Sequence, residues 1–178
     1  MYIGLLIAQQ IYKLSYNMME ESIEKQYGKH LRLRVAGLCN QNDKILVVNH
    51  TGLNNENEFW APPGGGLHYG ESVKDCLLRE FLEETGLKIA VGDFLHATEY
   101  LKPPLHAIEL FFAVEVLGGS LIRGTDPEVG VEDQIIANVE FMSFDTLLKI
   151  PDSRKHNIFH GVKKFERIFD KKGYSKFP

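Results

Sequence analysis

The order of hydrophobic and polar residues predicts mostly extended segments on either side of one well-marked helix. Residues 31–39 alternate between apolar and polar side chains, and residues 44–50 form an apolar run. The polar residues 41–44 between them favour a turn, so we expect the two segments to pair as a hairpin. The same criteria predict a short extended piece and three further strands, which are residues 59–66, 88–101, 106–116 and 135–144.

Three segments have the spacing of helices. Residues 72–85 place apolar side chains three and four positions apart, and Gly86 suits a left-handed C-cap. Residues 143–150 have the pattern of a helical turn with Ser143 as its N-cap. We also expect a terminal helix over 153–172, because its apolar residues fall on one side: Ile158, Val162, Phe165, Ile168 and Phe169. This alternation without repeats or a clear linker predicts a single α/β domain.

The composition is that of an ordinary globular domain. The chain has 178 residues, of which 44% are hydrophobic and 25% are charged, and its formal net charge is −4. This balance lacks the basic excess of a nucleic-acid or membrane-surface binder, so we expect neither as a partner. Cys39 and Cys76 have no CxxC spacing, which argues against a structural zinc site or a disulfide framework and fits a reducing cytoplasm.

The N-terminal residues differ in character from the rest. Residues 1–14 are apolar but shorter than the ~18 residues of a membrane span, and no basic residue precedes them as in a secretory signal. Met18 and Met19 open a polar stretch, so we expect the first 17 residues to be an upstream extension of the natural start. The alternative is an extra helix that packs on the domain. We therefore expect an N-terminal extension over 1–29 and one domain over 30–178.

The helix predicted at 72–85 carries charges in an unfavourable place. Glu80 and Glu84 project along its apolar stripe, and Glu83 lies at the flank of the stripe, within about 100° of arc. Like charges at these spacings destabilise a helix by roughly a few tenths of a kcal/mol per pair, and burial adds the cost of lost hydration. The stripe itself consists of Val73, Cys76, Leu77 and Phe81.

A bound divalent cation would remove this conflict. Mg²⁺ and Mn²⁺ prefer hard oxygen ligands, and glutamates one turn apart can converge on one ion or on two adjacent ions. The alternative is that the glutamates form a solvated acidic face. The surroundings favour the metal, because the glycines at 64–66 let the backbone approach a ligand, Glu71 opens the helix, and Arg79 can hold a neighbouring carboxylate.

Residues 65–87 resemble the Nudix box, whose pattern is G-x5-E-x7-R-E-U-x-E-E-x-G-U, with U a bulky apolar residue. The fixed positions are filled by Gly65, Glu71, Arg79, Glu80, Glu83, Glu84, Gly86 and Leu87. Phe81 stands at the first U, where the family more often has Ile, Leu or Val. The lead-in FWAPPGGG is similar to the family's W-x-x-P-G-G, and the likeness extends over about residues 30–150. The resemblance implies a Nudix fold, which is a mixed β-sheet sandwiched between helices.

The resemblance also implies a chemistry. Nudix enzymes hydrolyse a nucleoside diphosphate linked to another moiety by attack of water at phosphorus, with Mg²⁺ or Mn²⁺ as cofactor. Carried over position by position, the metal ligands are Glu80, Glu83 and Glu84, with Gly65 beside them. Arg79 would orient Glu80.

Two further roles follow from the same resemblance. The backbone at Gly64, Gly65 and Gly66 would reach the metal and the phosphates. The general base would be one of the box glutamates or a distal acid in the loop 124–134. That loop offers Glu128, Glu132 and Asp133, and we expect Glu128 or Glu132, while solvated loop charges are the alternative.

Few residues in the sequence indicate the substrate. In some groups of the family a proline sixteen positions past the box accompanies ADP-ribose, and here that position is Pro103. A stiff turn there would favour ADP-ribose or a sugar nucleotide over a nucleoside triphosphate. Trp60 and Tyr69 flank the glycine loop and are candidates to stack on a base, and His68 is a candidate to touch substrate. For each of them, packing or solvent exposure is the alternative.

Other functions remain open at this level. A nucleoside triphosphate pyrophosphohydrolase, including one for oxidised nucleotides, would use the same box, as would an isomerase or an RNA-processing member. A non-catalytic nucleotide-sensing module tends to lose box glutamates, whereas this chain keeps every one. We expect a small nucleotide as partner and a cytoplasmic location, and a homodimer is compatible with both. Cys76 is expected to pack in the core rather than to act as a nucleophile.

Overall fold

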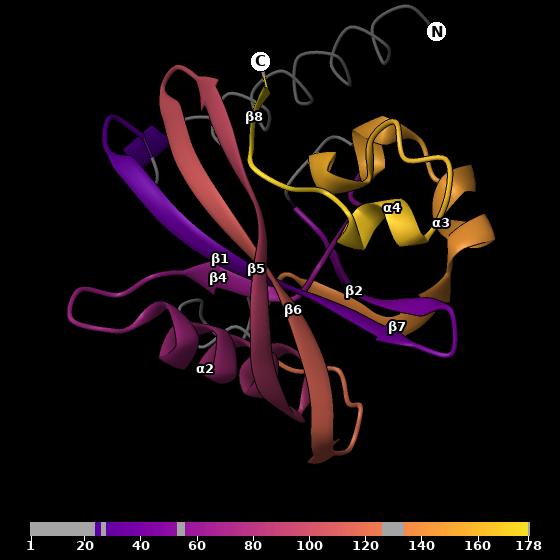
Figure 1. Cartoon of the computed structure of the whole chain (residues 1–178). Coiled ribbons are helices and arrows are strands. Elements are labelled where there is room, and N and C mark those ends of the chain that lie inside the picture. The colour runs from indigo at the N-terminus through magenta and orange to yellow at the C-terminus, as the bar shows by residue number, and fades with distance from the viewer. Residues whose placement is uncertain (1–23, 26–27, 53–55, 126–133, 178) are drawn as a thin grey trace, which may run out of the picture.

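The computed structural model describes residues 24–25, 28–52, 56–125 and 134–177 (Figure 1). Within them, one mixed sheet has the strand order β3-β2-β1-β6-β5-β8, with β4 paired to β1 and β7 to β2. β1 runs parallel to β6, and β5 runs parallel to β8. The strands are β1 (Leu31–Gln41), β2 (Lys44–His50), β3 (Phe59–Ala61), β4 (Gly64–Gly66), β5 (Leu87–Lys102), β6 (Leu105–Gly119), β7 (Ile136–Ser143) and β8 (Tyr174–Phe177).

The predicted strands are confirmed. β1 and β2 form the expected antiparallel hairpin, and its two turn residues, Asn42 and Asp43, have φ angles of 52° and 58°. Positive φ at both central positions is the type I′ geometry, which matches the twist of paired strands. β5 and β6 begin earlier or end later than the pattern indicated, and they pair antiparallel from Leu87 to Lys102.

The first two predicted helices are confirmed as well. Helix α2 (Val73–Thr85) begins after Ser72, whose side chain accepts a hydrogen bond from the Asp75 N–H at 3.2 Å. It ends at Gly86, which has a φ of 70° and donates its N–H to the Leu82 carbonyl at 3.0 Å. Helix α3 (Phe144–Lys149) begins at the expected N-cap. Local capping chemistry therefore fixes the helix on which the glutamates lie.

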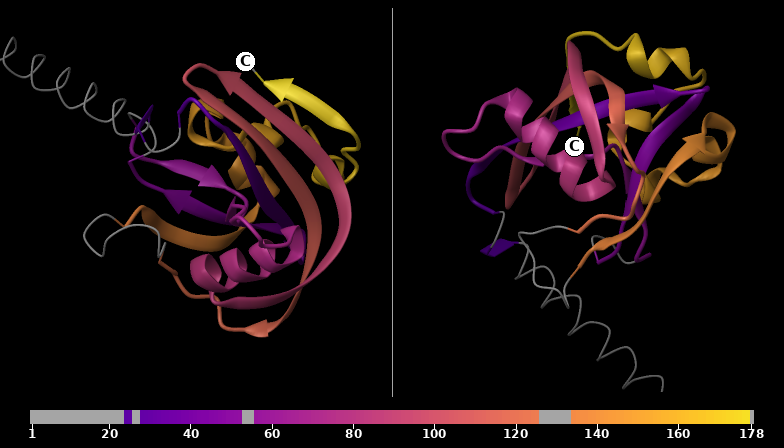
Figure 2. Two further views of the ribbon diagram at one scale, coloured as in Figure 1. Left: turned by 90° about the vertical axis from the view of Figure 1, so that its left-hand side faces the viewer. Right: turned by 90° about the horizontal axis from the view of Figure 1, so that it is seen from below.

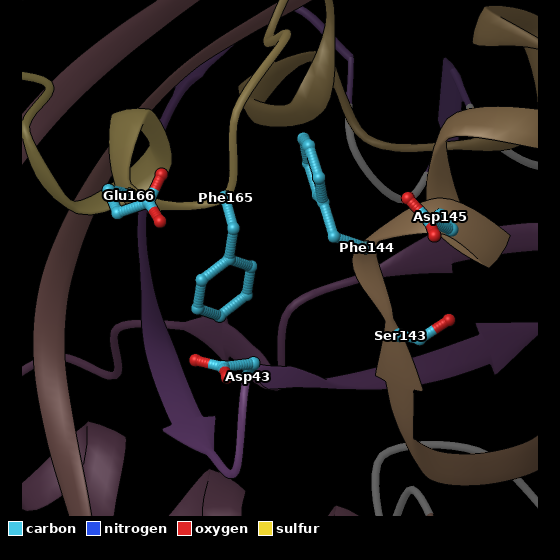
Figure 3. Close-up of a pocket in the computed structure, with 6 residues that line it drawn as sticks. All are labelled: Asp43, Ser143, Phe144, Asp145, Phe165 and Glu166. Atoms are coloured by element: carbon cyan, nitrogen blue, oxygen red, sulfur yellow. The ribbon is translucent and has the colours of Figure 1, made fainter.

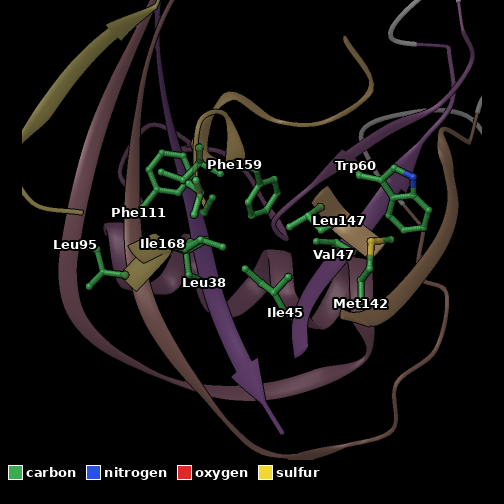
Figure 4. Packing of buried hydrophobic residues seen from close by; sticks show 13 residues of the cluster. Leu38, Ile45, Val47, Trp60, Leu95, Phe111, Met142, Leu147, Phe159 and Ile168 are labelled. Atoms are coloured by element: carbon green, nitrogen blue, oxygen red, sulfur yellow. The ribbon is translucent and has the colours of Figure 1, made fainter. Parts of the chain in front are cut away.

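Helices cover both faces of the sheet, which confirms the sandwich expected from the sequence (Figure 2). Because successive residues of a strand point to opposite faces, β1 and β2 supply side chains to two cores. The core beneath α2 takes from these strands Val35, Cys39, Leu46 and Val48. The core beneath α3 and the C-terminal segment takes Ala36, Leu38, Ile45 and Val47 (Figure 4).

The terminal helix predicted over 153–172 is wrong. The chain instead forms two 3-10 turns, η2 (Asp152–Arg154) and η3 (Asn157–Phe159), and then a short helix α4 (Glu166–Phe169) before β8. Gly161 has a φ of 67°, in the left-handed region, and this conformation interrupts a helix. The apolar residues behind the prediction still pack in the core: Ile158, Val162 and Ile168 are buried, and Phe165 and Phe169 lie against them.

Some expectations fall on residues outside the described ranges. They concern the upstream extension in the first 17 residues and the distal acids Glu128, Glu132 and Asp133. In the part of the chain that the structure describes, no helix is long and apolar enough to cross a membrane.

Candidate active site

Helix α2 places the glutamates of the sequence motif against the glycine strand β4. Glu80 and Glu84 retain 8% and 6% of their surface exposed, whereas Glu83 is partly exposed. The one-turn spacing puts Glu80 and Glu84 on the buried side of the helix, which also carries Cys76. Two buried carboxylates next to each other need a compensating positive group.

Arg79 connects these carboxylates to the start of the same helix. Its Nε and Nη2 donate to the two oxygens of Glu71 at 2.9 and 3.1 Å. Its Nη1 donates to Glu80 at 2.8 Å and to Glu83 at 3.1 Å, and Nη2 also donates to the Gly66 carbonyl at 3.3 Å. The paired bonds from Arg79 lower the pKa of Glu71 to about 2. Arg79 thus fixes Glu80 and Glu83 relative to the glycine loop.

The glycine strand lies so close to the carboxylates that side chains would not fit between them. The Gly64 N–H donates to Glu84 Oε2 at 2.9 Å. A Cβ on Gly65 would overlap the Glu80 carboxylate, and a Cβ on Gly64 would overlap the backbone of Val35. Glycine is therefore required at position 65 by the close approach of helix α2, and at position 64 by the close approach of strand β1.

The donor set fits a divalent cation by its chemistry. Burial raises the pKa of Glu80 to about 7, and repulsion from Glu84 adds to this shift while Arg79 opposes it. Carboxylate oxygens that repel one another in this way suit Mg²⁺ or Mn²⁺. Among the described residues, however, no three His, Cys, Asp or Glu side chains are arranged as a ready-made metal site. Arg79 holds Glu80 and Glu83, so a cation held there would take further ligands from water or substrate.

These groups line a cavity of about 490 Å³. That volume lies within the usual range for small-molecule sites. Strands β1, β5 and β6 contribute to its walls Arg32, Arg34, Thr98, Tyr100, His106 and Glu109. The C-terminal segment contributes Asp152, Lys155, His156, Asn157 and His160. The mixture of cations and carboxylates suits a charged, polar ligand.

Within the cavity, Glu109 joins β1 to the C-terminal segment. Its Oε1 accepts a hydrogen bond from Arg34 Nε at 3.4 Å, and its Oε2 lies 2.8 Å from His156 Nε2. Burial alone would raise the pKa of Glu109, but His156 and Arg34 outweigh burial and hold it at about 2. The Glu109 carboxylate is therefore ionised at neutral pH.

The sequence reasoning did not select Arg34, Glu109 or His156. The available signal was Glu109, the one acidic residue in the otherwise apolar run 107–114. His50 was also missed as a site residue, and it lines the cavity with Nε2 3.5 Å from Glu84 Oε1.

Trp60 does not line the cavity, which corrects the expectation that it stacks on a base. It is 7% exposed, packs in the core, and donates its Nε1–H to Glu58 Oε1 at 2.7 Å. Because strand residues alternate in direction, its neighbours Phe59 and Ala61 line the cavity instead.

The other residues expected near substrate lie around the cavity rather than on its walls. His68 and Tyr69 are exposed in the loop between β4 and α2. Pro103 is exposed in the turn between β5 and β6, whereas the wall includes Tyr100 before that turn and Leu105 after it.

Cys76 packs in the core. Its thiol is buried and donates to the Gly66 carbonyl at 3.3 Å, and burial raises its pKa to about 12. It is therefore protonated at neutral pH, which is unfavourable for a nucleophile.

A second pocket has a volume of about 290 Å³ (Figure 3). Its walls are Asp43, Ser143, Phe144, Asp145, Phe165 and Glu166. No residue of the sequence motif belongs to this pocket, so the larger cavity is the candidate active site.

Known proteins are similar to this chain in sequence. The family model described as the NUDIX domain matches residues 28–160. An ADP-ribose pyrophosphatase from Methanocaldococcus jannaschii is 34% identical over 109 residues, which cover 57% of this chain and 62% of that protein. An 8-oxo-dGTP diphosphatase from Proteus vulgaris is 27% identical over 86 residues, which cover 48% of this chain and 77% of that protein. The alignment thus spans less than two thirds of the archaeal relative.

Solved structures share the fold at low sequence identity. A UDP-X diphosphatase aligns with a TM-score of 0.61 and 19% identity, over 90% of this chain and 75% of that one. A NUDIX hydrolase from Nitrosomonas europaea aligns with a TM-score of 0.60 and 16% identity, over 82% of this chain and 79% of that one. Both likenesses agree with the sandwich described above.

Proposed function

The chain belongs to the NUDIX domain family, and from this premise we propose that it is a hydrolase that cleaves the diphosphate of a nucleoside diphosphate linked to a sugar. The observation that carries the proposal is the position of Glu80, Glu83 and Glu84. They lie on the wall of a cavity whose other walls carry Arg32 and Arg34. Carboxylates for a cation and arginines for an anion in one cavity suit a diphosphate.

Glu80, Glu83 and Glu84 are the residues that would hold Mg²⁺ or Mn²⁺. Such a cation neutralises phosphate charge and lowers the pKa of water. The chain's own contribution is to fix these carboxylates: Arg79 holds Glu80 and Glu83, and the Gly64 N–H holds Glu84. A fixed site avoids the cost of rearranging its groups as the reaction proceeds.

Hydrolysis forms a bond between the oxygen of water and one phosphorus and breaks the bond from that phosphorus to the bridging oxygen. The proton of the water passes to a glutamate of the box, or to Glu128 or Glu132. The leaving phosphate departs with the bridging oxygen and its electron pair. The products are a nucleoside monophosphate and a sugar phosphate.

Three observations support ADP-ribose or a sugar nucleotide as substrate. The archaeal relative is named an ADP-ribose pyrophosphatase. Pro103 stands at the position that accompanies ADP-ribose in some groups of the family. Phe59 and Tyr100 line the cavity and offer aromatic surface to a base, the role first considered for Trp60.

The test is a comparison of kcat/KM with Mg²⁺ for ADP-ribose, UDP-sugars, nucleoside triphosphates and 8-oxo-dGTP. We expect ADP-ribose or a UDP-sugar to exceed each triphosphate at least tenfold. A tenfold preference for a triphosphate would contradict the proposed substrate but not the proposed hydrolase activity. The panel includes 8-oxo-dGTP because one relative is named an 8-oxo-dGTP diphosphatase. Added EDTA should abolish turnover of every substrate.

A further inference from the structure

The strand wall of the cavity contains a cross-strand row of residues. Parallel pairing aligns Arg34 of β1 with Glu109 of β6, and antiparallel pairing aligns Glu109 with Thr98 of β5. On the other edge of β1, Gly66 of β4 lies opposite Arg34. Directly paired residues point to the same face of a sheet, and all four of these residues line the cavity. The row therefore leads from the glycine strand into the cavity.

Arg34 is the cation of this row, and it still has donors to offer. Its one hydrogen bond to the described residues runs from Nε to Glu109 Oε1 at 3.4 Å, so both Nη groups are left for a ligand. Its side chain is 33% exposed and lines the cavity. Burial opposes its charge, but Glu109, Glu84 and Glu80 outweigh burial and raise the pKa of Arg34. Arg34 is thus within electrostatic reach of the candidate metal ligands.

Two other cations of the cavity wall are already engaged with the chain. Arg79 donates to carboxylates and to the Gly66 carbonyl. Lys155 is 5% exposed, and its Nζ donates to the Ile150 carbonyl at 2.8 Å and lies 3.2 Å from Asp152 Oδ1.

Glu109 and His156 hold Arg34 in place. His156 Nδ1 accepts the Ile158 N–H at 3.2 Å, so Nε2 carries the proton that is shared with Glu109 at 2.8 Å. The His156 ring also packs against Phe59 and Phe111, with centroid distances of 6.3 and 5.7 Å. A histidine held at both nitrogens and by two neighbouring aromatic rings fixes one Glu109 oxygen and leaves the other for Arg34.

We propose that Arg34 binds the diphosphate of the substrate through its Nη groups, and that Glu109 and His156 are its positioning residues. This inference rests on the proposed function, because it assumes that the substrate contains a diphosphate. A guanidinium with its Nε bound to a carboxylate presents two Nη groups in one plane, a geometry that matches phosphate oxygens. Arg34 would then hold the anion that the glutamates alone would repel.

The first test measures binding without turnover. The full chain, in the presence of Mg²⁺, is titrated calorimetrically with each of two ligands. One is methylenediphosphonate, which lacks a nucleoside and a cleavable bridge, and the other is adenosine, which lacks phosphate. We expect Arg34→Gln to lower the affinity for methylenediphosphonate about tenfold to a hundredfold, because a charge-assisted hydrogen bond is lost. The affinity for adenosine should not change. Arg34→Lys should recover part of the affinity. Arg167→Gln, an equal loss of charge on the exposed helix α4, should change neither.

The outcomes against the inference are also defined. The inference is overturned if the wild-type chain does not bind methylenediphosphonate. It is also overturned if Arg34→Gln loses affinity for adenosine instead of methylenediphosphonate. If Arg34→Gln lost methylenediphosphonate affinity while no substrate of the panel was hydrolysed, the inference would stand and the proposed function would fail.

The second test uses the sign of a charge effect. If Glu109 acted only as a nearby negative charge, Glu109→Gln would bind methylenediphosphonate more tightly. If Glu109 positions Arg34, the same variant should bind it several-fold more weakly, and tighter binding overturns the positioning role. Thermal unfolding checks that the variant is folded. Should Glu109→Gln not fold, His156→Phe keeps an aromatic ring at this position but cannot donate to Glu109, and the same fall in affinity is expected.

Discussion

At the scale of single residues, the site depends on groups that each hold another group. Arg79 contacts Glu71, Glu80 and Glu83 at once, and Glu84 is held separately by the Gly64 N–H. Glu80 and Glu83 therefore depend on Arg79 for their positions, whereas Glu84 does not. Substitution of one of these side chains affects catalysis and folding stability to different extents, and the two effects can be measured separately.

We expect Glu83→Gln and Glu84→Gln to lower kcat about a hundredfold or more, because a metal ligand is lost. Folding should persist, since the amide keeps an acceptor oxygen and repulsion among the carboxylates falls. Steady-state kinetics at saturating Mg²⁺ and thermal unfolding without metal measure the two effects. Near wild-type turnover in either variant would show that its carboxylate is not a metal ligand.

Arg79→Lys keeps the charge but removes the planar pair of bonds to Glu71. We expect kcat/KM to fall at least tenfold and the free energy of unfolding to fall by about 1–3 kcal/mol. Kinetics and urea titration check both, with Arg167→Lys on the exposed face of α4 as the control. Unchanged kinetics would mean that Glu80 and Glu83 keep their positions without the guanidinium.

At the scale of elements, α2 depends on its C-cap. Gly86 has a φ of 70°, and a Cβ there would lie 2.6 Å from Ile122 Cγ1 and 2.7 Å from the Ser120 carbonyl oxygen. We expect Gly86→Ala to lower the free energy of unfolding by about 1–3 kcal/mol, because both the backbone and the contacts become strained. Gly118→Ala, where no atom lies within 4 Å, is the matched control. Equal stabilities of the two variants in urea would contradict the capping role.

The same elements show what the sequence could predict. α2 and the hairpin of β1 and β2 were predictable because their signals are local: Ser72 and Gly86 cap the helix, and Asn42 and Asp43 make the turn. The terminal helix failed because spacing reports which residues are buried, not the backbone that buries them. Residues such as Ile158 reached the core through two 3-10 turns that precede the left-handed Gly161.

The candidate site also has a part that local sequence signals predict and a part that they do not. The box glutamates and Arg79 were found from their spacing on one helix. Arg34 and Glu109 meet across β1 and β6 although they are 75 residues apart, and His156 reaches them from a segment expected to be a regular helix. Such contacts depend on the register of the sheet, which a single sequence does not display.

At the scale of the whole molecule, Glu109 ties the sheet to the C-terminal segment and makes stability depend on pH. Its pKa falls from 4.5 to about 2 on folding, which corresponds to about 3 kcal/mol of stability. Because the folded pKa is the lower one, this stability is complete above pH 4.5 and is lost as the pH falls towards 2. Urea titrations of the wild type and Glu109→Gln should therefore differ by a constant amount above pH 5 and approach each other as the pH falls from 4.5 towards 2. Curves that stay parallel down to pH 2 would contradict the assignment.

The cavity draws its walls from separate stretches of the chain, and this division has a consequence for altering the protein. Helix α2 and strand β4 carry groups proposed for bond cleavage, whereas residues 152–160 carry the wall residues Asn157 and His160 in addition to His156, which positions Arg34. Those wall residues lie in short turns, so their replacement need not disturb a long helix. An exchange of this stretch with that of a relative, with His156 kept, therefore changes selectivity and leaves the reactive centre unchanged.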